Sequence, residues 1–64
     1  MTMVEEKKLR HLIARFNNVK HSFVTVLSVE LLENGIQKVR AKVQSYTIEY
    51  LLQRNAIVKA AYVV

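Results

Sequence analysis

Hydrophobic and polar residues alternate in two runs of the chain, one on each side of Asn34-Gly35. Alternation with a period of two is typical of β-strands, and Asn-Gly between two such runs is the strongest local signal for a hairpin. The pattern predicts a first strand over Val19 to Glu33 and a second over Ile36 to Ser45. The paired part of this ribbon runs from Phe23 to Tyr46, and its faces decide what the chain presents to solvent.

The length of the loop sets the register of the ribbon. A two-residue turn at Asn34-Gly35 would place Val29 opposite Arg40 and would mix apolar and basic side chains on one face. A three-residue loop over residues 33–35 ends on glycine, which adopts a left-handed conformation without steric cost. It places Val29 opposite Val39, which keeps apolar residues together, and we therefore predict this loop.

In this register, the two faces of the ribbon differ in character. One face is apolar and consists of Phe23, Thr25, Leu27, Val29, Leu31, Val39, Ala41 and Val43. The other face carries the cations Lys38, Arg40 and Lys42, with Val26, Ser28, Glu30 and Gln44 beside them. Alternate strand residues lie ~7 Å apart, a spacing that suits the successive phosphates of a nucleic-acid strand. Glu30 faces Lys38 and partly neutralises it.

The first part of the chain, Thr2 to Asn18, has the pattern of an amphipathic helix. Thr2 and Glu5 have the spacing of a capping box, and asparagine at the end tolerates a left-handed conformation. Leu9, Leu12, Ile13 and Phe16 form one apolar stripe. The basic residues Lys7, Lys8, Arg10, His11 and Arg15 occupy the other faces. The regular stripe favours a helix that covers a sheet over a basic nucleic-acid-binding helix.

Thr47 to Val64 can be read in two ways. Strands over Ile48 to Gln53 and Ala56 to Val64 would flank a turn at Arg54-Asn55, where asparagine can take a positive φ. A helix over the same residues would place Asn55 and Lys59 on its apolar face, so the strands fit better. We expect one α+β domain over residues 1–64, with an N-terminal helix, a long antiparallel hairpin and two further strands. The alternative is an α-β-β-α order with a C-terminal helix.

Composition and charge narrow the class of protein. The 64 residues include no cysteine and two histidines, so neither a disulfide nor a metal site is expected to support the fold. A chain of this length forms only a small core, and 52% of its residues are hydrophobic. Both features suggest that the protein is a homo-oligomer. The net charge of +5 suggests an anionic partner such as nucleic acid or a membrane surface. We expect a cytoplasmic protein, because no apolar run is long enough for a membrane helix and the N-terminus lacks the apolar core of a secretory signal.

Motifs for catalysis are lacking in the sequence. Gly35 is the only glycine, so there is no glycine-rich phosphate loop. His21 and Ser22 are adjacent in the predicted strand, where their side chains would point to opposite faces. His11 lies off the apolar stripe and is expected to be solvated. We expect neither an enzyme nor a bound cofactor.

The order of elements resembles the Sm-like and Hfq-like small β-barrel family. The residues that carry the resemblance are Leu31 to Gln37, Val39 to Tyr46 and Ile57 to Ala61. The chain differs from the family pattern at Ala41, Thr47 and Ala60, where a glycine, an aspartate and a histidine are usual. The resemblance implies a ring of subunits joined edge to edge through the last strands. It also implies single-stranded RNA bound near Tyr46 and Lys59.

From these observations we predict a small non-enzymatic nucleic-acid-binding protein that acts as a homo-oligomeric regulator or chaperone. We expect it to bind RNA in preference to DNA. The predicted contact residues are Lys38, Arg40, Lys42, Tyr46, Arg54 and Lys59. The alternative is a protein–protein interaction module, such as a small regulator or a phage-type accessory protein. Its interface would be an apolar patch on the outer hairpin face, formed by Val24, Val26, Leu32 and Ile36.

Overall fold

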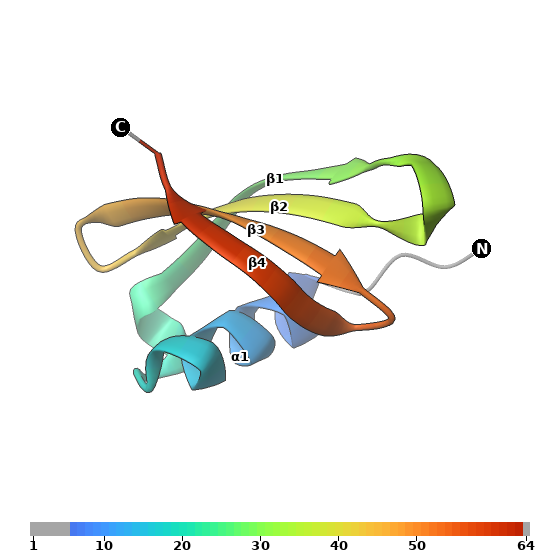
Figure 1. Cartoon of the computed structure of the whole chain (residues 1–64). Helices are drawn as coiled ribbons and strands as arrows, with labels where there is room; N and C mark the ends of the chain where they lie inside the picture. The colour runs from blue at the N-terminus through green and yellow to red at the C-terminus, as the bar shows by residue number, and fades with distance from the viewer. Residues whose placement is uncertain (1–5, 64) are drawn as a thin grey trace.

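One helix packs against one face of a four-stranded antiparallel sheet (Figure 1). The computed structural model describes residues 6–63. Its elements are α1 (Glu6–Asn17), a 3₁₀ turn (His21–Phe23), β1 (Val24–Leu31), a second 3₁₀ turn (Glu33–Gly35), β2 (Gln37–Val43), β3 (Tyr46–Gln53) and β4 (Ala56–Tyr62). The strands follow in the order β1-β2-β3-β4, each antiparallel to the next. The α+β prediction is confirmed, and the alternative with a C-terminal helix is wrong.

The helix ends as its sequence predicts. Asn18 has a φ of 55°, the left-handed conformation that asparagine tolerates. The Asn18 N–H donates to the Arg15 carbonyl at 3.1 Å, and the Val19 N–H donates to the Ala14 carbonyl at 2.9 Å. This pair of bonds is a Schellman motif, which satisfies two of the last helical carbonyls. The predicted capping box of Thr2 and Glu5 lies outside the described residues.

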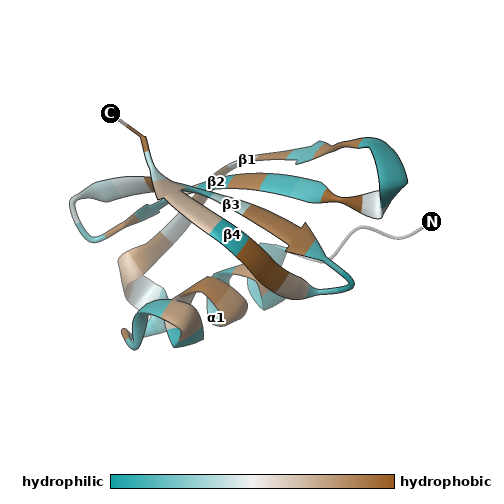
Figure 2. Ribbon diagram, in the orientation of Figure 1, coloured by the Kyte–Doolittle hydropathy of each residue, from teal (hydrophilic) through white to brown (hydrophobic). Residues whose placement is uncertain are grey.

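The core lies between α1 and the inner face of the sheet. Figure 2 shows the matching pattern in the sequence, with hydrophobic and hydrophilic residues alternating along β2. Its buried apolar residues are Leu9, Ile13, Ala14, Val24, Val39, Ala41, Val43, Ile48, Tyr50 and Leu52. Three of them come from α1 and six from β2 and β3, where alternate residues point inward. Of the predicted helical stripe, Phe16 is the exception, because its side chain is 56% exposed.

The three-residue hairpin loop is confirmed. Asn34 and Gly35 have φ values of 63° and 73°, so both residues are left-handed. The Leu32 N–H donates to the Ile36 carbonyl at 2.7 Å and closes the loop around residues 33–35. Val29 then pairs with Val39 as predicted.

A β-bulge at Leu27 changes the register of the outer part of the ribbon. Val26 pairs with Ala41 and Val24 pairs with Val43, whereas the sequence predicted Leu27 and Thr25 at these places. The bulge adds one residue to β1, and this shift reverses the faces of all residues before it. Val24 is therefore buried, while Phe23, Thr25 and Leu27 are exposed. The first strand also begins later than predicted, because residues 21–23 form a 3₁₀ turn.

Two tight turns complete the sheet. Arg54 and Asn55, with φ values of 54° and 63°, connect β3 to β4 as predicted. Gln44, at a φ of 56°, begins the turn from β2 to β3, which the sequence did not predict. β3 therefore starts at Tyr46, two residues before the predicted start. Val64, the predicted end of the last strand, lies outside the described residues.

Candidate nucleic-acid interface

The cations of β2 lie on the sheet face opposite α1. Lys38, Arg40 and Lys42 alternate with residues that point into the core. Lys42 and Arg40 are exposed, and Lys38 is half-buried. The hairpin thus presents its three cations on one face, which is the arrangement that a strand of phosphates requires.

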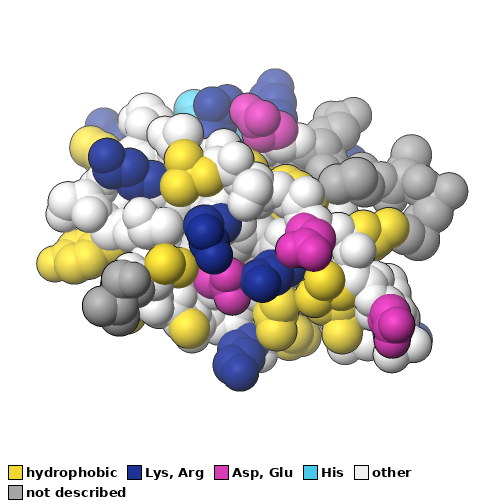
Figure 3. All heavy atoms as spheres, turned by 90° about the horizontal axis from the view of Figure 1, so that it is seen from above, with side chains coloured by type: hydrophobic (Ala, Val, Ile, Leu, Met, Phe, Trp, Pro, Cys, Tyr) yellow, Lys and Arg dark blue, Asp and Glu magenta, His cyan; other side chains and the backbone are white. Residues whose placement is uncertain are grey.

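Glu49 on β3 lies in the middle of this row. Its carboxylate accepts a hydrogen bond from Arg40 Nη2 at 3.1 Å, and Lys38 Nζ lies 3.7 Å from the same oxygen. Glu30 of β1 pairs with Lys38 from the other side. Figure 3 shows the result, in which dark-blue and magenta side chains lie next to one another on this face. The face is therefore of mixed charge.

The other predicted contact residues lie in three different places. Lys59 of β4 pairs with Leu51, which pairs with Lys38, so Lys59 shares the outer face with the β2 cations. Arg54 is exposed in the β3–β4 turn. Tyr46 pairs with the buried Val43 and so lies on the inner side of the sheet, away from the cations. We name Lys38, Arg40, Lys42 and Lys59 the sheet surface.

A second group of cations lies on α1. Lys7, Lys8, His11, Leu12 and Arg15 line a shallow hollow of about 470 Å³, and we name these five residues the helix surface. Within the described part of the chain, residues 6–63, no aspartate or glutamate lines this hollow. Among residues 6–63, the ion pairs within 4.0 Å are those of Lys38 and Arg40 with Glu49, so no helix cation is neutralised by such a pair.

The sequence signal for the helix surface was the spacing of its charges. Lys7, His11 and Arg15 recur every four residues and so lie along one side of a helix. The regular apolar stripe nevertheless favours a helix that covers a sheet, with its charges scattered over the other faces. The structure shows that α1 both covers the core with one side and presents its cations with another.

His11 lies among the positive charges of the helix surface. Its ring stacks on that of His21, with the centroids 4.5 Å apart. Desolvation lowers the pKa of His11 below 6.5, and the nearby charges of His21, Arg10, Lys7 and Arg15 lower it further. A local excess of positive charge disfavours the imidazolium ion, and an anion bound there would favour it. The prediction that His11 is simply solvated missed this stacking, because His21 lies in the 3₁₀ turn.

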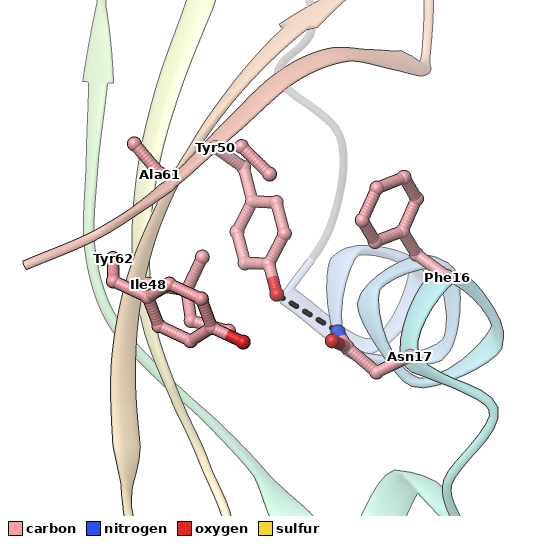
Figure 4. A pocket seen from close by; sticks show the side chains of 7 residues that line it. Phe16, Asn17, Ile48, Tyr50, Ala61 and Tyr62 are labelled. Atoms are coloured by element: carbon pink, nitrogen blue, oxygen red, sulfur yellow. Dashed lines mark hydrogen bonds between the residues drawn. The ribbon is translucent and has the colours of Figure 1, made fainter.

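A third feature is an apolar hollow of about 290 Å³ between the end of α1 and β4 (Figure 4). It is lined by Phe16, Asn17, Ile48, Tyr50, Ala60, Ala61 and Tyr62. Asn17 Nδ2 donates to the Ile13 carbonyl and to Tyr50 Oη, both at 2.8 Å, so both amide hydrogens are used. Burial raises the pKa of Tyr50 above 10, although the hydrogen bond from Asn17 opposes this shift.

The apolar outer patch of the alternative interaction module is not formed as predicted. Val24 belongs to the core, and Val26 packs against it. Ile36 is half-buried, and Leu32 is exposed at the far end of the hairpin. The bulge at Leu27 is the reason, because it turns Val24 and Val26 inward.

Comparison with known proteins found no matching family model, no matching curated protein and no matching solved structure. Within residues 6–63, no helix has the length and apolar character needed to cross a membrane. In the same part of the chain, no three side chains of His, Cys, Asp or Glu come together as metal ligands would.

Proposed function

We propose that this protein is a small non-enzymatic nucleic-acid-binding protein whose main contact is the helix surface. The observation that carries this proposal is the hollow lined by Lys7, Lys8, His11 and Arg15, in which residues 6–63 place no acidic side chain. A row of cations without neutralising partners is the usual electrostatic footprint of a polyanion site. The sheet surface is the weaker site, because Glu49 neutralises part of it.

The mode of binding follows from the kind of groups present. Lys7, Lys8 and Arg15 would contact phosphate oxygens, and contacts of this kind position a strand without reading its sequence. A phosphate near His11 would raise the pKa that its cationic neighbours now lower. Binding would therefore be of low sequence specificity and would weaken steeply with salt.

The sheet surface is the second candidate for the same function. Lys42 is exposed, and no acidic side chain lies within 4.0 Å of its ammonium among residues 6–63. Lys59 adds a fourth cation on the neighbouring edge strand. In this mode, a strand of nucleic acid would lie across the open face of the sheet, as the sequence predicted.

The proposal has three further parts, namely a preference for RNA over DNA, a role as a regulator or chaperone, and a cytoplasmic location. They rest on the resemblance to the Sm-like family and on the basic charge. A helix followed by a four-stranded meander is compatible with the order of elements in that family.

Two matched variants test the proposal and distinguish the two surfaces. One carries Lys7→Gln, Lys8→Gln and Arg15→Gln, and the other carries Lys38→Gln, Arg40→Gln and Lys42→Gln. Each lowers the net charge by three, so non-specific electrostatic effects are equal. The assay is fluorescence anisotropy with labelled single-stranded RNA and DNA of ~20 nucleotides in 50 mM salt.

We expect the helix variant to bind at least ten times more weakly than the sheet variant. The reverse order would assign binding to the sheet surface instead. If the unaltered protein binds neither nucleic acid at low salt, the proposal is wrong.

A further inference from the structure

The edge strand β4 is almost entirely exposed, although it is mainly apolar. Its residues Ala56 to Tyr62 include one charge, Lys59, and only Ile57 is half-buried. An exposed edge with little charge and no proline is a ready template for pairing with another strand. The other edge, β1, differs because it carries Ser28 and Glu30 and its inner side lies against α1.

The helix leaves the inner side of β4 uncovered. Phe16, Tyr46, Ile57, Ala60 and Tyr62 form what we name the uncovered strip. Phe16, Tyr46 and Tyr62 are 56%, 58% and 69% exposed. The rings of Tyr46 and Tyr62 meet edge to face with their centroids 5.7 Å apart, and the ring of Phe16 meets that of Tyr50 in the same way at 5.9 Å. The strip is therefore ordered by its own contacts while it stays open to solvent.

The backbone of β4 shows which groups are free to pair. The Val63 N–H donates to the Thr47 carbonyl at 2.9 Å, so residue 63 directs its backbone groups toward β3. The directions of the backbone N–H and C=O groups alternate along a strand. The backbone groups of Ala61 therefore also point toward β3, and those of Ala60 and Tyr62 point away from β3, toward the open edge of the sheet. Ala60 and Tyr62 together supply two N–H and two C=O groups to a new neighbouring strand.

We propose that β4 pairs antiparallel with β4 of a second copy, about a two-fold axis that passes through Ala61 perpendicular to the sheet. In this register Tyr62 lies opposite Ala60 of the partner subunit, and the two pairs exchange four backbone hydrogen bonds. The small Ala60 side chain leaves room for the partner's Tyr62 ring. The two Lys59 side chains do not face each other, since each lies opposite Val63 of the partner subunit. The four-stranded sheet becomes one sheet of eight strands.

Symmetry favours a second copy over an unrelated protein. A two-fold axis perpendicular to the sheet keeps both helices on the same side, so each uncovered strip meets the other. Three aromatic side chains, each more than half exposed, offer roughly 100 Å² apiece. With the strand backbone and the smaller side chains of both copies, about 1,000 Å² would be buried, which is near the lower limit for a specific interface.

The dimer supplies what a 64-residue chain without cysteine lacks, namely a larger core. It also places both helix surfaces on one side of the joined sheet. The inference does not depend on the proposed function, because it rests on the edge strand and the uncovered strip alone.

Single-cysteine cross-linking tests the register, because the chain has no cysteine of its own. Ala61→Cys places two thiols beside the axis in a non-hydrogen-bonded pair, where the Cα atoms lie ~4.5 Å apart, within the range that a disulfide spans. Thr25→Cys, on the exposed side of the other edge strand, is the matched control. We expect mild oxidation to convert most of the Ala61→Cys protein, and little of the control, to a covalent dimer. Preferential cross-linking of the control would overturn the proposal.

The mass in solution tests the pairing itself. Light scattering should give twice the chain mass of 7.4 kDa for the unaltered protein. Ala60→Pro removes an N–H that points away from β3, so the variant should keep its circular dichroism spectrum and become a monomer. A monomeric unaltered protein at 0.1 mM, or a dimer that persists in a folded Ala60→Pro variant, would contradict the proposal. If Ala60→Pro does not fold, the mass of the unaltered protein and the cross-linking decide.

Discussion

Replacing Glu49 by glutamine removes the charge that joins two strands on the outer face while it keeps the size of the side chain. The carboxylate contacts Arg40 at 3.1 Å and Lys38 at 3.7 Å. The side chains of Arg40, Lys38 and Glu49 are 47%, 37% and 29% exposed, so water and salt screen both ion pairs. Pairs of this kind contribute about 0.2–1 kcal/mol each, and we expect the variant to lose about 1 kcal/mol of unfolding free energy.

The assay is thermal unfolding followed by circular dichroism at low salt. For a domain of this size, 1 kcal/mol corresponds to a fall in Tm of about 4–8 °C. Glu33→Gln is the matched control, because Glu33 lies in the hairpin loop and forms no ion pair within 4.0 Å among residues 6–63. Since the Debye length falls to about 3 Å in 1 M salt, the difference between the variants should nearly disappear there. Equal effects of the two substitutions, or a loss that persists in 1 M salt, would refute the ion-pair account.

Three further predictions concern the core, the loop and the pH dependence. Ile13→Ala should cost about 2–5 kcal/mol in urea unfolding, because the side chain is fully buried, and a loss below 1 kcal/mol would contradict the placement of α1. Gly35→Ala should lower the free energy of unfolding by about 1–2 kcal/mol. An added Cβ meets no atom within 4 Å, so this loss comes from the φ of +73° alone. Asn34→Gly should lower the free energy of unfolding by less, and equal losses would disprove the explanation. His11 has a lowered pKa, so the folded protein binds fewer protons than the unfolded one between that pKa and 6.5. The contribution of His11 to the free energy of unfolding should therefore be fully present above pH 6.5 and should be lost as the pH drops through this interval. His11→Gln should flatten this part of the Tm–pH curve, and an unchanged slope would contradict the assignment.

Local signals in the sequence were sufficient for much of the fold. Asn34, Gly35 and Asn55 adopt the left-handed conformation that their residue types favour, and Arg54 adopts it beside Asn55 although arginine does not favour it. Alternation along β2 correctly predicted which residues face outward, because each inward residue is apolar or small, apart from Gln37. The apolar stripe of the helix correctly predicted that Leu9 and Ile13 pack into the core.

The features that the sequence did not reveal depend on tertiary contacts. The bulge at Leu27 has no marker residue, and it forms because Val24 and Val26 gain burial beneath α1. The turn after β2 has glutamine at a positive φ, where no glycine or asparagine signals it. Without that turn, the sequence does not predict the pairing of Arg40 with Glu49, so the sheet surface is less basic than the row of cations in β2 indicates.

The most direct test of the account is the salt dependence of binding to single-stranded RNA. If Lys7, Lys8 and Arg15 neutralise three phosphates, the logarithm of the affinity should fall with the logarithm of the salt concentration with a slope of about −2. Affinity should then fall about 20-fold between 50 and 200 mM salt, and this dependence should be largely lost when the three residues are replaced by glutamine. A dimer that engages both helix surfaces would show a slope of about −4. The account is contradicted if there is no binding at 50 mM salt or if the slope is unchanged in the helix variant.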